Sequence, residues 1–191
     1  MLFRSYIDFR LFESKIVMKK LNKLKIAISS NENNILLLLV GDEPEPGDNN
    51  HSNIVKYLKP HLKSLSYLKS EKNCNVSTVW IKEHKSYFPL TKIERNLIKN
   101  SFKNLNFKTR FISDFMPKSY KNLPGECMLR YCNFDYIIAE PSAFLFNVSG
   151  TNILPIAAYS QFQDYRNTDQ ISRNDEFLKI KNLLNTKVKV I

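Results

Sequence analysis

The feature that most constrains the fold of this chain is an alternation of short apolar runs with segments of helical periodicity. The apolar or β-branched runs are Ile35 to Val40, Val76 to Lys82, Phe107 to Ser113 and Phe134 to Ala139. Continuous runs of this kind are typical of strands that are buried on both faces, and parallel strands need a long connection, usually a helix. The alternation therefore predicts βαβ units.

The segments between and after the runs supply the helices. Apolar residues recur every three or four positions in them, as on one face of a helix. The predicted helices are Ser52 to Lys69, Thr91 to Asn104, Leu123 to Tyr131 and the helix that opens at Ser142 to Phe146. Thr91 and Glu94 have the spacing of a capping box. Pro60 is expected to kink or divide its helix, because proline lacks the backbone N–H.

The whole pattern predicts one α/β domain, a Rossmann-like parallel sheet with helices on both faces. A chain of 191 residues is long enough for a single core. Residues 1–31, with a helical pattern over Arg10 to Lys25, are expected to form a docking helix or a linker. Residues 32–191 are expected to form the domain, with a last strand at Ile153 to Ala158 and a closing helix at Asn174 to Leu184. In such sheets ligands bind beyond the carboxyl ends of the strands.

The motifs that are missing narrow the chemistry. The four glycines form neither a dinucleotide-binding G-x-G-x-x-G motif nor a P-loop, and there is no G-x-S-x-G nucleophile elbow. The histidines are too scattered for a metal triad, and the odd number of cysteines without C-x-x-C spacing favours neither zinc nor a disulfide framework. The residues concerned are His51, His61, His84, Cys74, Cys127 and Cys132. We therefore expect no metal and no resident cofactor.

The formal net charge of +11 is compatible with nucleic acid, anionic lipid or a phosphate-bearing substrate, and also with a biased base composition of the source genome. The longest apolar run, Ile35 to Val40, is too short to span a bilayer. The charged beginning of the chain is unlike a signal peptide. We expect no transmembrane segment and a cytoplasmic location, either free or peripheral at the inner membrane.

Two predicted strand ends carry groups that suit a phosphate. Lys82, His84 and Lys85 follow the second strand, where cationic donors favour an anion, and Ser142 stands at the start of a helix, where backbone N–H groups and a hydroxyl bind phosphate. Between them Glu126, in the turn Leu123 to Glu126, is a carboxylate that suits a ribose diol. Each of these residues also has a purely structural interpretation. Ser142 can be a helix cap, Glu126 a charge that complements a helix dipole, and His84 an ordinary loop residue.

In this order the segments resemble the donor-binding half of bacterial sialyltransferases, including the polysialyltransferases of capsules and the lipooligosaccharide sialyltransferases. The resemblance runs from about Ile35 to Val148: a strand and Gly-containing loop at Leu36 to Pro44, a Lys-x-His motif at Lys82 to His84, an L-P-x-E turn at Leu123 to Glu126 and a strand leading to a serine at Ile137 to Ala143. The resemblance implies one half of a metal-independent glycosyltransferase of the B type.

The resemblance also implies a function. The chain would bind a nucleotide sugar, CMP-sialic acid, for capsule or lipooligosaccharide glycan synthesis. His84, with Lys82 or Lys85, and Ser142 would hold the phosphate, and Glu126 would orient the ribose. The other half of such an enzyme binds the glycan acceptor and supplies the catalytic carboxylate. We therefore expect a half-enzyme that is inactive in isolation, or one that works with an acceptor-domain partner protein.

Two interpretations of other classes remain open. One is a basic nucleic-acid-binding module, with Tyr57, Tyr67, Trp80 and Tyr87 as stacking residues, although no nucleic-acid-binding motif supports specific binding. The other is a non-catalytic subunit of a glycan-synthesis complex. Binding to arbitrary DNA with a steep salt dependence would favour the first.

Overall fold

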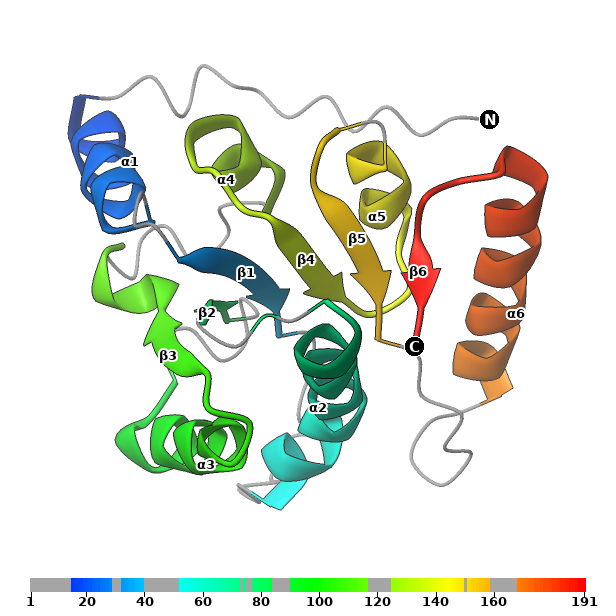
Figure 1. Cartoon of the computed structure of the whole chain (residues 1–191), viewed down its shortest axis with the longest axis horizontal. Helices are drawn as coiled ribbons and strands as arrows, with labels where there is room; N and C mark the ends of the chain where they lie inside the picture. Colours follow the sequence, from blue (N-terminus) through cyan, green and yellow to red (C-terminus); the bar gives the residue numbers. More distant parts are fainter. Residues whose placement is uncertain are drawn as a thin grey trace.

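The computed structural model describes residues 15–28, 32–39, 52–72, 74, 77–83, 90–116, 125–149, 151–158 and 168–191. In these ranges six strands form one sheet in the order β3-β2-β1-β4-β5-β6, and every neighbouring pair is parallel (Figure 1). The predicted α/β fold, a Rossmann-like parallel sheet with helices on both faces, is thus confirmed. The strands are β1 (Asn33–Leu38), β2 (Ser77–Lys82), β3 (Lys108–Phe111), β4 (Tyr136–Ala139), β5 (Leu154–Ala157) and β6 (Lys189–Val190).

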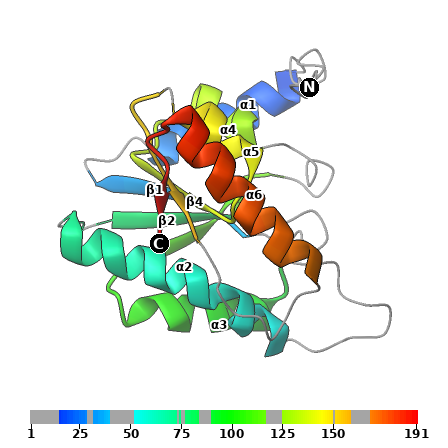
Figure 2. The same cartoon turned by 90° about the vertical axis from the view of Figure 1, so that its right-hand side faces the viewer.

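The helices divide into two layers. α2 and α3 cover one face of the sheet and lie below it in Figure 1, whereas α1, α4, α5 and α6 cover the other, an arrangement that Figure 2 shows from the side. Their bounds are α1 (Lys15–Ile28), α2 (Ser52–Glu71), α3 (Lys92–Lys103), α4 (Gly125–Tyr131), α5 (Ala143–Val148) and α6 (Thr168–Leu184), with a 3₁₀ turn, η3 (Ile112–Asp114), after β3.

β1 shows why the apolar runs are continuous. Its side chains alternate between the two layers: Ile35 and Leu37 pack with α2 and α3, and Leu36 packs with the opposite layer. All three are fully buried. Since neither face of the central strand meets water, no polar position is needed, and burying each such side chain contributes about 1.5–3 kcal/mol.

The strand order defines where the chain reverses direction across the sheet. From β1 the chain moves outward to β2 and β3 through α2 and α3, and it then returns past β1 to β4 and moves outward again to β5 and β6. β1 and β4 are therefore the pair between which the order reverses. In open α/β sheets, ligands bind at this point, beyond the carboxyl ends of the strands.

Two helix predictions had different outcomes. α3 begins with the predicted capping box: Thr91 Oγ1 accepts from the backbone N–H of Glu94, and Glu94 Oε2 accepts from the backbone N–H of Thr91 at 2.6 Å. Of the two outcomes expected for Pro60, division of the helix was wrong, because α2 runs unbroken through Pro60, and a kink stays a prediction. The buried packing of neighbours such as His61 and Leu65 outweighs the loss of one backbone donor.

The ends of the chain contribute more to the domain than the sequence indicated. Leu21, Leu24 and Ile28 of α1 are buried in the core layer that contains α4. The last predicted strand was not the last, because β6 adds to the edge of β5 after α6. α6 ends in a left-handed Asn185, whose backbone N–H donates to Asn182 and is followed by a Thr186 N–H that donates to Lys181. This arrangement is the usual C-terminal helix cap.

Candidate functional site

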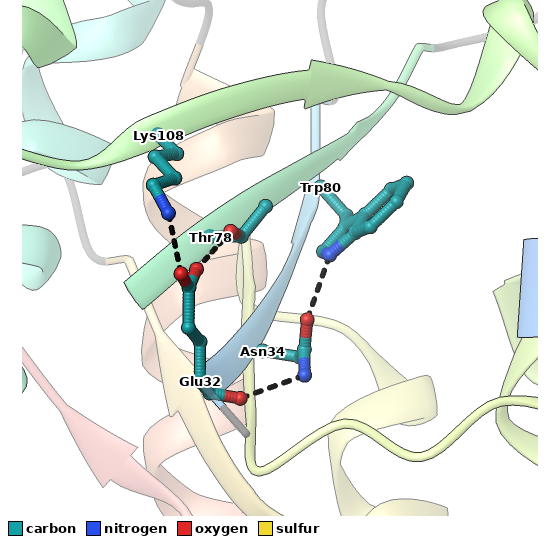
Figure 3. Close-up of polar contacts among 5 residues, drawn as sticks. All are labelled: Glu32, Asn34, Thr78, Trp80 and Lys108. Carbon is teal, nitrogen blue, oxygen red and sulfur yellow. Dashed lines mark hydrogen bonds and ion pairs between the residues drawn. The ribbon is translucent and has the colours of Figure 1, made fainter. Parts of the chain in front are cut away.

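A polar network around Asn34 lies where the strands begin, at their amino-terminal ends, which we call the amino edge of the sheet. The Asn34 side chain donates to the carbonyl oxygen of Glu32 at 2.9 Å and accepts from Trp80 Nε1 at 2.9 Å (Figure 3). It also donates to the carbonyl oxygen of Ile28 at 2.8 Å. Its backbone N–H donates to Asp135 Oδ2 at 2.8 Å. Asn34 is buried, and each of its polar side-chain atoms has a partner. These bonds join α1, β1, β2 and the start of β4, so the network has a structural role.

Glu32 extends this network at the same edge. Its carboxylate binds Lys108 of β3 and accepts from Thr78 Oγ1 of β2 at 3.0 Å (Figure 3). The hydrogen bond from Lys108, followed by that from Thr78, lowers the pKa of Glu32. Because ligands of parallel α/β sheets bind at the opposite edge, we do not assign these residues to the site.

Three elements come together around the end of β1, at the carboxyl-terminal ends of the strands, which we call the carboxyl edge of the sheet. Lys82, the last residue of β2, is in register with Leu38, the last residue of β1. A Cβ added to Gly125 at the start of α4 would lie 3.3 Å from both terminal methyl carbons of Leu38 and 3.6 Å from the ring of Phe144 in α5. The first turns of α4 and α5 therefore both approach the end of β1. Glycine permits this approach because it has no side chain.

Ser142 is the N-cap residue of α5, directly before Ala143. It follows β4, the strand on the other side of β1 from β2. The side chain is exposed and makes no capping hydrogen bond. Its hydroxyl is therefore not committed to the helix, in contrast to that of Thr91, which caps α3.

The structure describes some of the predicted site residues and not others. Lys82 is half-buried at the end of β2, and Ser142 is exposed beyond β4, so both lie at the carboxyl edge and flank β1. The backbone of Glu126 belongs to the first turn of α4, but its side chain falls outside the described part. His84 and Lys85 lie outside the described residues, and their assignment to the phosphate stays a prediction.

Glu83, the residue directly after β2, was not predicted as a site residue from the sequence. Its side chain is fully buried, and the hydroxyl of Ser113 in η3 donates to Oε1. Arg95 of α3 donates to Ser113 Oγ at 3.1 Å and to Asp114 Oδ1 at 2.5 Å, and its guanidinium stacks 4.2 Å from the centre of the Phe111 ring. This cluster links the carboxyl ends of β2 and β3 with the first turn of α3. Only its position at a strand end pointed to Glu83 in the sequence.

Burial raises the pKa of Glu83 above its ordinary value, while the hydrogen bond from Ser113 and the charge of Arg95 lower it in part. Desolvation is the larger effect because it disfavours the charged carboxylate. A carboxyl group with a raised pKa at a ligand edge is a recognised sign of a functional residue, although structural clusters shift pKa values as well.

This pKa shift predicts a pH dependence of stability. The folded state binds the Glu83 proton more tightly than the unfolded state, so the contribution to stability is fully present below the ordinary pKa of glutamate. It is lost as the pH rises through the raised pKa. We expect the free energy of unfolding of the native protein, minus that of Glu83→Gln, to fall over this range in urea denaturation at a series of pH values.

Ser113→Ala provides the control for this prediction. Because the Ser113 hydroxyl lowers the pKa of Glu83, its removal should move the fall in stability to higher pH. A difference between native protein and Glu83→Gln that is constant, or that grows with pH, would show that Glu83 does not titrate in this way.

The described residues also provide evidence on metal binding, on base stacking and on membrane spans. No group of three or more His, Cys, Asp or Glu side chains among them is arranged to hold a metal ion. Trp80 is 1% exposed and its indole N–H is bound to Asn34, so its ring is not free to stack on a base. The stacking role considered for Trp80 was therefore wrong. None of the helices in the described ranges combines the length and apolar character that crossing a membrane requires.

Comparison of the chain with protein-family models, with curated proteins and with solved structures found no significant match.

Proposed function

We propose that the chain is a glycosyltransferase-type donor domain that binds a nucleotide sugar at the carboxyl edge of its sheet, with CMP-sialic acid as the donor. The proposal includes a glycan acceptor that is held by an acceptor domain or a partner protein. Glycan synthesis for a capsule or lipooligosaccharide is the process to which such a donor belongs.

The observation that carries the proposal is the meeting of β2, α4 and α5 around the end of β1. Lys82 is in register with Leu38, and Gly125 brings the first turn of α4 against Leu38 and Phe144. The described residues of the segments that resemble the sialyltransferase motifs, namely Lys82, Gly125 and Ser142, thus lie at one edge of one sheet, around the end of β1. This is where doubly wound folds bind nucleotides.

The residues have complementary roles in this proposal. The ammonium group of Lys82, with His84 and Lys85, neutralises the donor phosphate, and the uncommitted hydroxyl of Ser142 donates a hydrogen bond to it. In the transfer reaction, the bond between the sugar and the phosphate oxygen breaks and negative charge grows on the departing nucleotide. Cationic and hydroxyl donors placed beforehand stabilise that charge. The sequence-based hypothesis assigns Glu126 to the ribose of the nucleoside.

The test is calorimetric titration of the protein with CMP, UMP and GMP. We expect CMP to bind most tightly, and we expect Lys82→Ala to weaken CMP by about 5- to 150-fold, which corresponds to a charge-assisted contact of about 1–3 kcal/mol. Ser142→Ala should have a smaller effect in the same direction. The matched control is Lys63→Ala, which removes an equal charge from an exposed position on α2.

Each alternative result has a specific meaning. Equal affinity for the three nucleotides would contradict the cytidine donor and leave a general phosphate site. Equal weakening by Lys82→Ala and Lys63→Ala would show that only net charge matters, as expected for a nonspecific polyanion interaction. Absence of nucleotide binding would refute the donor domain.

A further inference from the structure

The cluster around Glu83 contains two buried polar atoms without partners among the described residues. These atoms are Oε2 of Glu83 and Nε of Arg95. The first is a hydrogen-bond acceptor when the carboxyl is ionised, and the second is a donor. Leaving such groups unpaired is unfavourable, and an unsatisfied pair at one place calls for a partner that presents both a donor and an acceptor.

The cluster is held in place by its other contacts. Oε1 of Glu83 accepts from Ser113, Arg95 donates to Ser113 and Asp114, and the guanidinium is stacked on Phe111. The side chains therefore cannot rotate to pair the two atoms without breaking bonds already made. The outer part of the cluster meets solvent, because the side chains of Arg95 and Asp114 are 25% and 51% exposed, whereas the Glu83 carboxyl group is fully buried.

The position of the cluster relates it to the nucleotide. Glu83 directly follows Lys82, and Ser113 and Asp114 follow β3, the strand next to β2. A nucleotide whose phosphate lies near the end of β1 can extend its nucleoside over β2 and β3.

We propose that Glu83 and Arg95 bind the vicinal diol of the ribose of the nucleotide, one hydroxyl donating to Glu83 Oε2 and the other accepting from Arg95 Nε. This inference rests on the proposed function and adds a specificity-determining pair to the same site. It differs from the assignment of the ribose to Glu126, which came from the sequence alone.

The chemistry selects a diol over the other parts of the ligand. A phosphate would be repelled by the Glu83 carboxylate, whereas a hydroxyl both donates and accepts. Both unpaired atoms are buried, so a hydroxyl reaches them only when the surrounding side chains shift, and a hydroxyl requires a smaller shift than a whole base. An ordered water has the same hydrogen-bonding character, so the experiment must separate the two.

The experiment combines substitution of Glu83 with removal of single ribose hydroxyls, as in a double-mutant cycle. Calorimetry measures the affinity of each protein for CMP, 2′-deoxy-CMP and 3′-deoxy-CMP. In the native protein, loss of the hydroxyl that binds Glu83 should weaken affinity by about 10- to 100-fold. In Glu83→Met, which has a side chain of similar length without acceptor oxygens, the same deoxynucleotide should lose less than about threefold. Glu83→Gln, which preserves the shape, should give an intermediate ratio, and it decides the matter if Glu83→Met does not fold.

The outcomes separate this inference from the proposed function. The deciding quantity is the affinity for CMP divided by that for the deoxynucleotide. If this ratio is the same in the native protein and in the Glu83 variants, the inference is overturned, and this is the result expected if the two atoms bind only water. If the ratio falls towards one in Glu126→Gln and not in the Glu83 variants, the ribose is bound by Glu126. Binding of CMP with no preference over either deoxynucleotide overturns the inference alone, whereas absence of binding by any nucleotide overturns both.

Discussion

Trp80→Ala is expected to lower the free energy of unfolding by about 3–5 kcal/mol, the range for deleting a large buried aromatic side chain. Trp80 is 1% exposed in the middle of β2, and its ring packs 5.6 Å from that of Phe115 and lies 5.4 Å from the Arg110 guanidinium. Deletion of the ring removes these contacts and leaves a cavity that the sheet cannot fill, because β2 is hydrogen-bonded on both sides. Urea denaturation monitored by far-UV circular dichroism measures the change.

Two further variants separate the parts of this effect. Trp80→Phe keeps an aromatic ring and loses the indole N–H, so Oδ1 of Asn34 loses its donor, and we expect a cost of about 1–3 kcal/mol. Ile93→Ala, at a position 60% exposed on α3, should change stability by less than about 0.5 kcal/mol. If Trp80→Ala were no more harmful than Ile93→Ala, the indole would not be part of the core.

The sequence predicted the architecture because each element had an apolar pattern of its own. The run at Ile35 to Val40 located β1, and the spacing of Thr91 and Glu94 located the start of α3. The features that the sequence did not predict lack such a pattern. β6 has only two residues in a lysine-rich tail, and its pairing with β5 depends on a neighbour distant in sequence. Pro60 is tolerated because of tertiary packing, which a local rule cannot represent.

The sequence predicted at which edge of the sheet the candidate site lies, but it did not predict the side-chain contacts within the site. The order of the motifs was sufficient to place Lys82 and Ser142 at carboxyl ends, because parallel strands all end on the same side. The cluster of Glu83 is different, since its partners come from α3 and η3, and no spacing in the sequence indicates that Arg95 and Ser113 meet at this carboxylate.

The two edges of the sheet differ in how their polar groups are satisfied. At the amino edge, Asn34 makes hydrogen bonds through both side-chain atoms to groups on three different segments. At the carboxyl edge, Glu83 and Arg95 each keep an atom without a partner among the described residues, and Ser142 does not cap its helix. We therefore expect substitutions at the amino edge to affect stability and those at the carboxyl edge to affect ligand binding.

Asn34→Leu tests the amino edge and is expected to lower the free energy of unfolding by about 2–4 kcal/mol. Leucine has a similar volume, so little cavity forms, but it leaves the buried indole N–H of Trp80 without an acceptor and removes the donor to Ile28 and Glu32. An orphaned buried group alone costs about 1–3 kcal/mol, and the two lost carbonyl contacts add to this. Urea denaturation gives the value.

Combining Asn34→Leu with Trp80→Phe identifies the cause. The double variant has no orphaned indole N–H, so its cost should be smaller than the sum of the single costs by about 0.5–3 kcal/mol. Additive costs would mean that the hydrogen bond between these side chains contributes nothing. The folded Asn34→Leu protein should bind CMP with unchanged affinity, because Asn34 lies four residues, or roughly 13 Å along β1, from the ligand edge at Leu38. A large loss of CMP affinity in the folded variant would contradict the division of roles between the two edges.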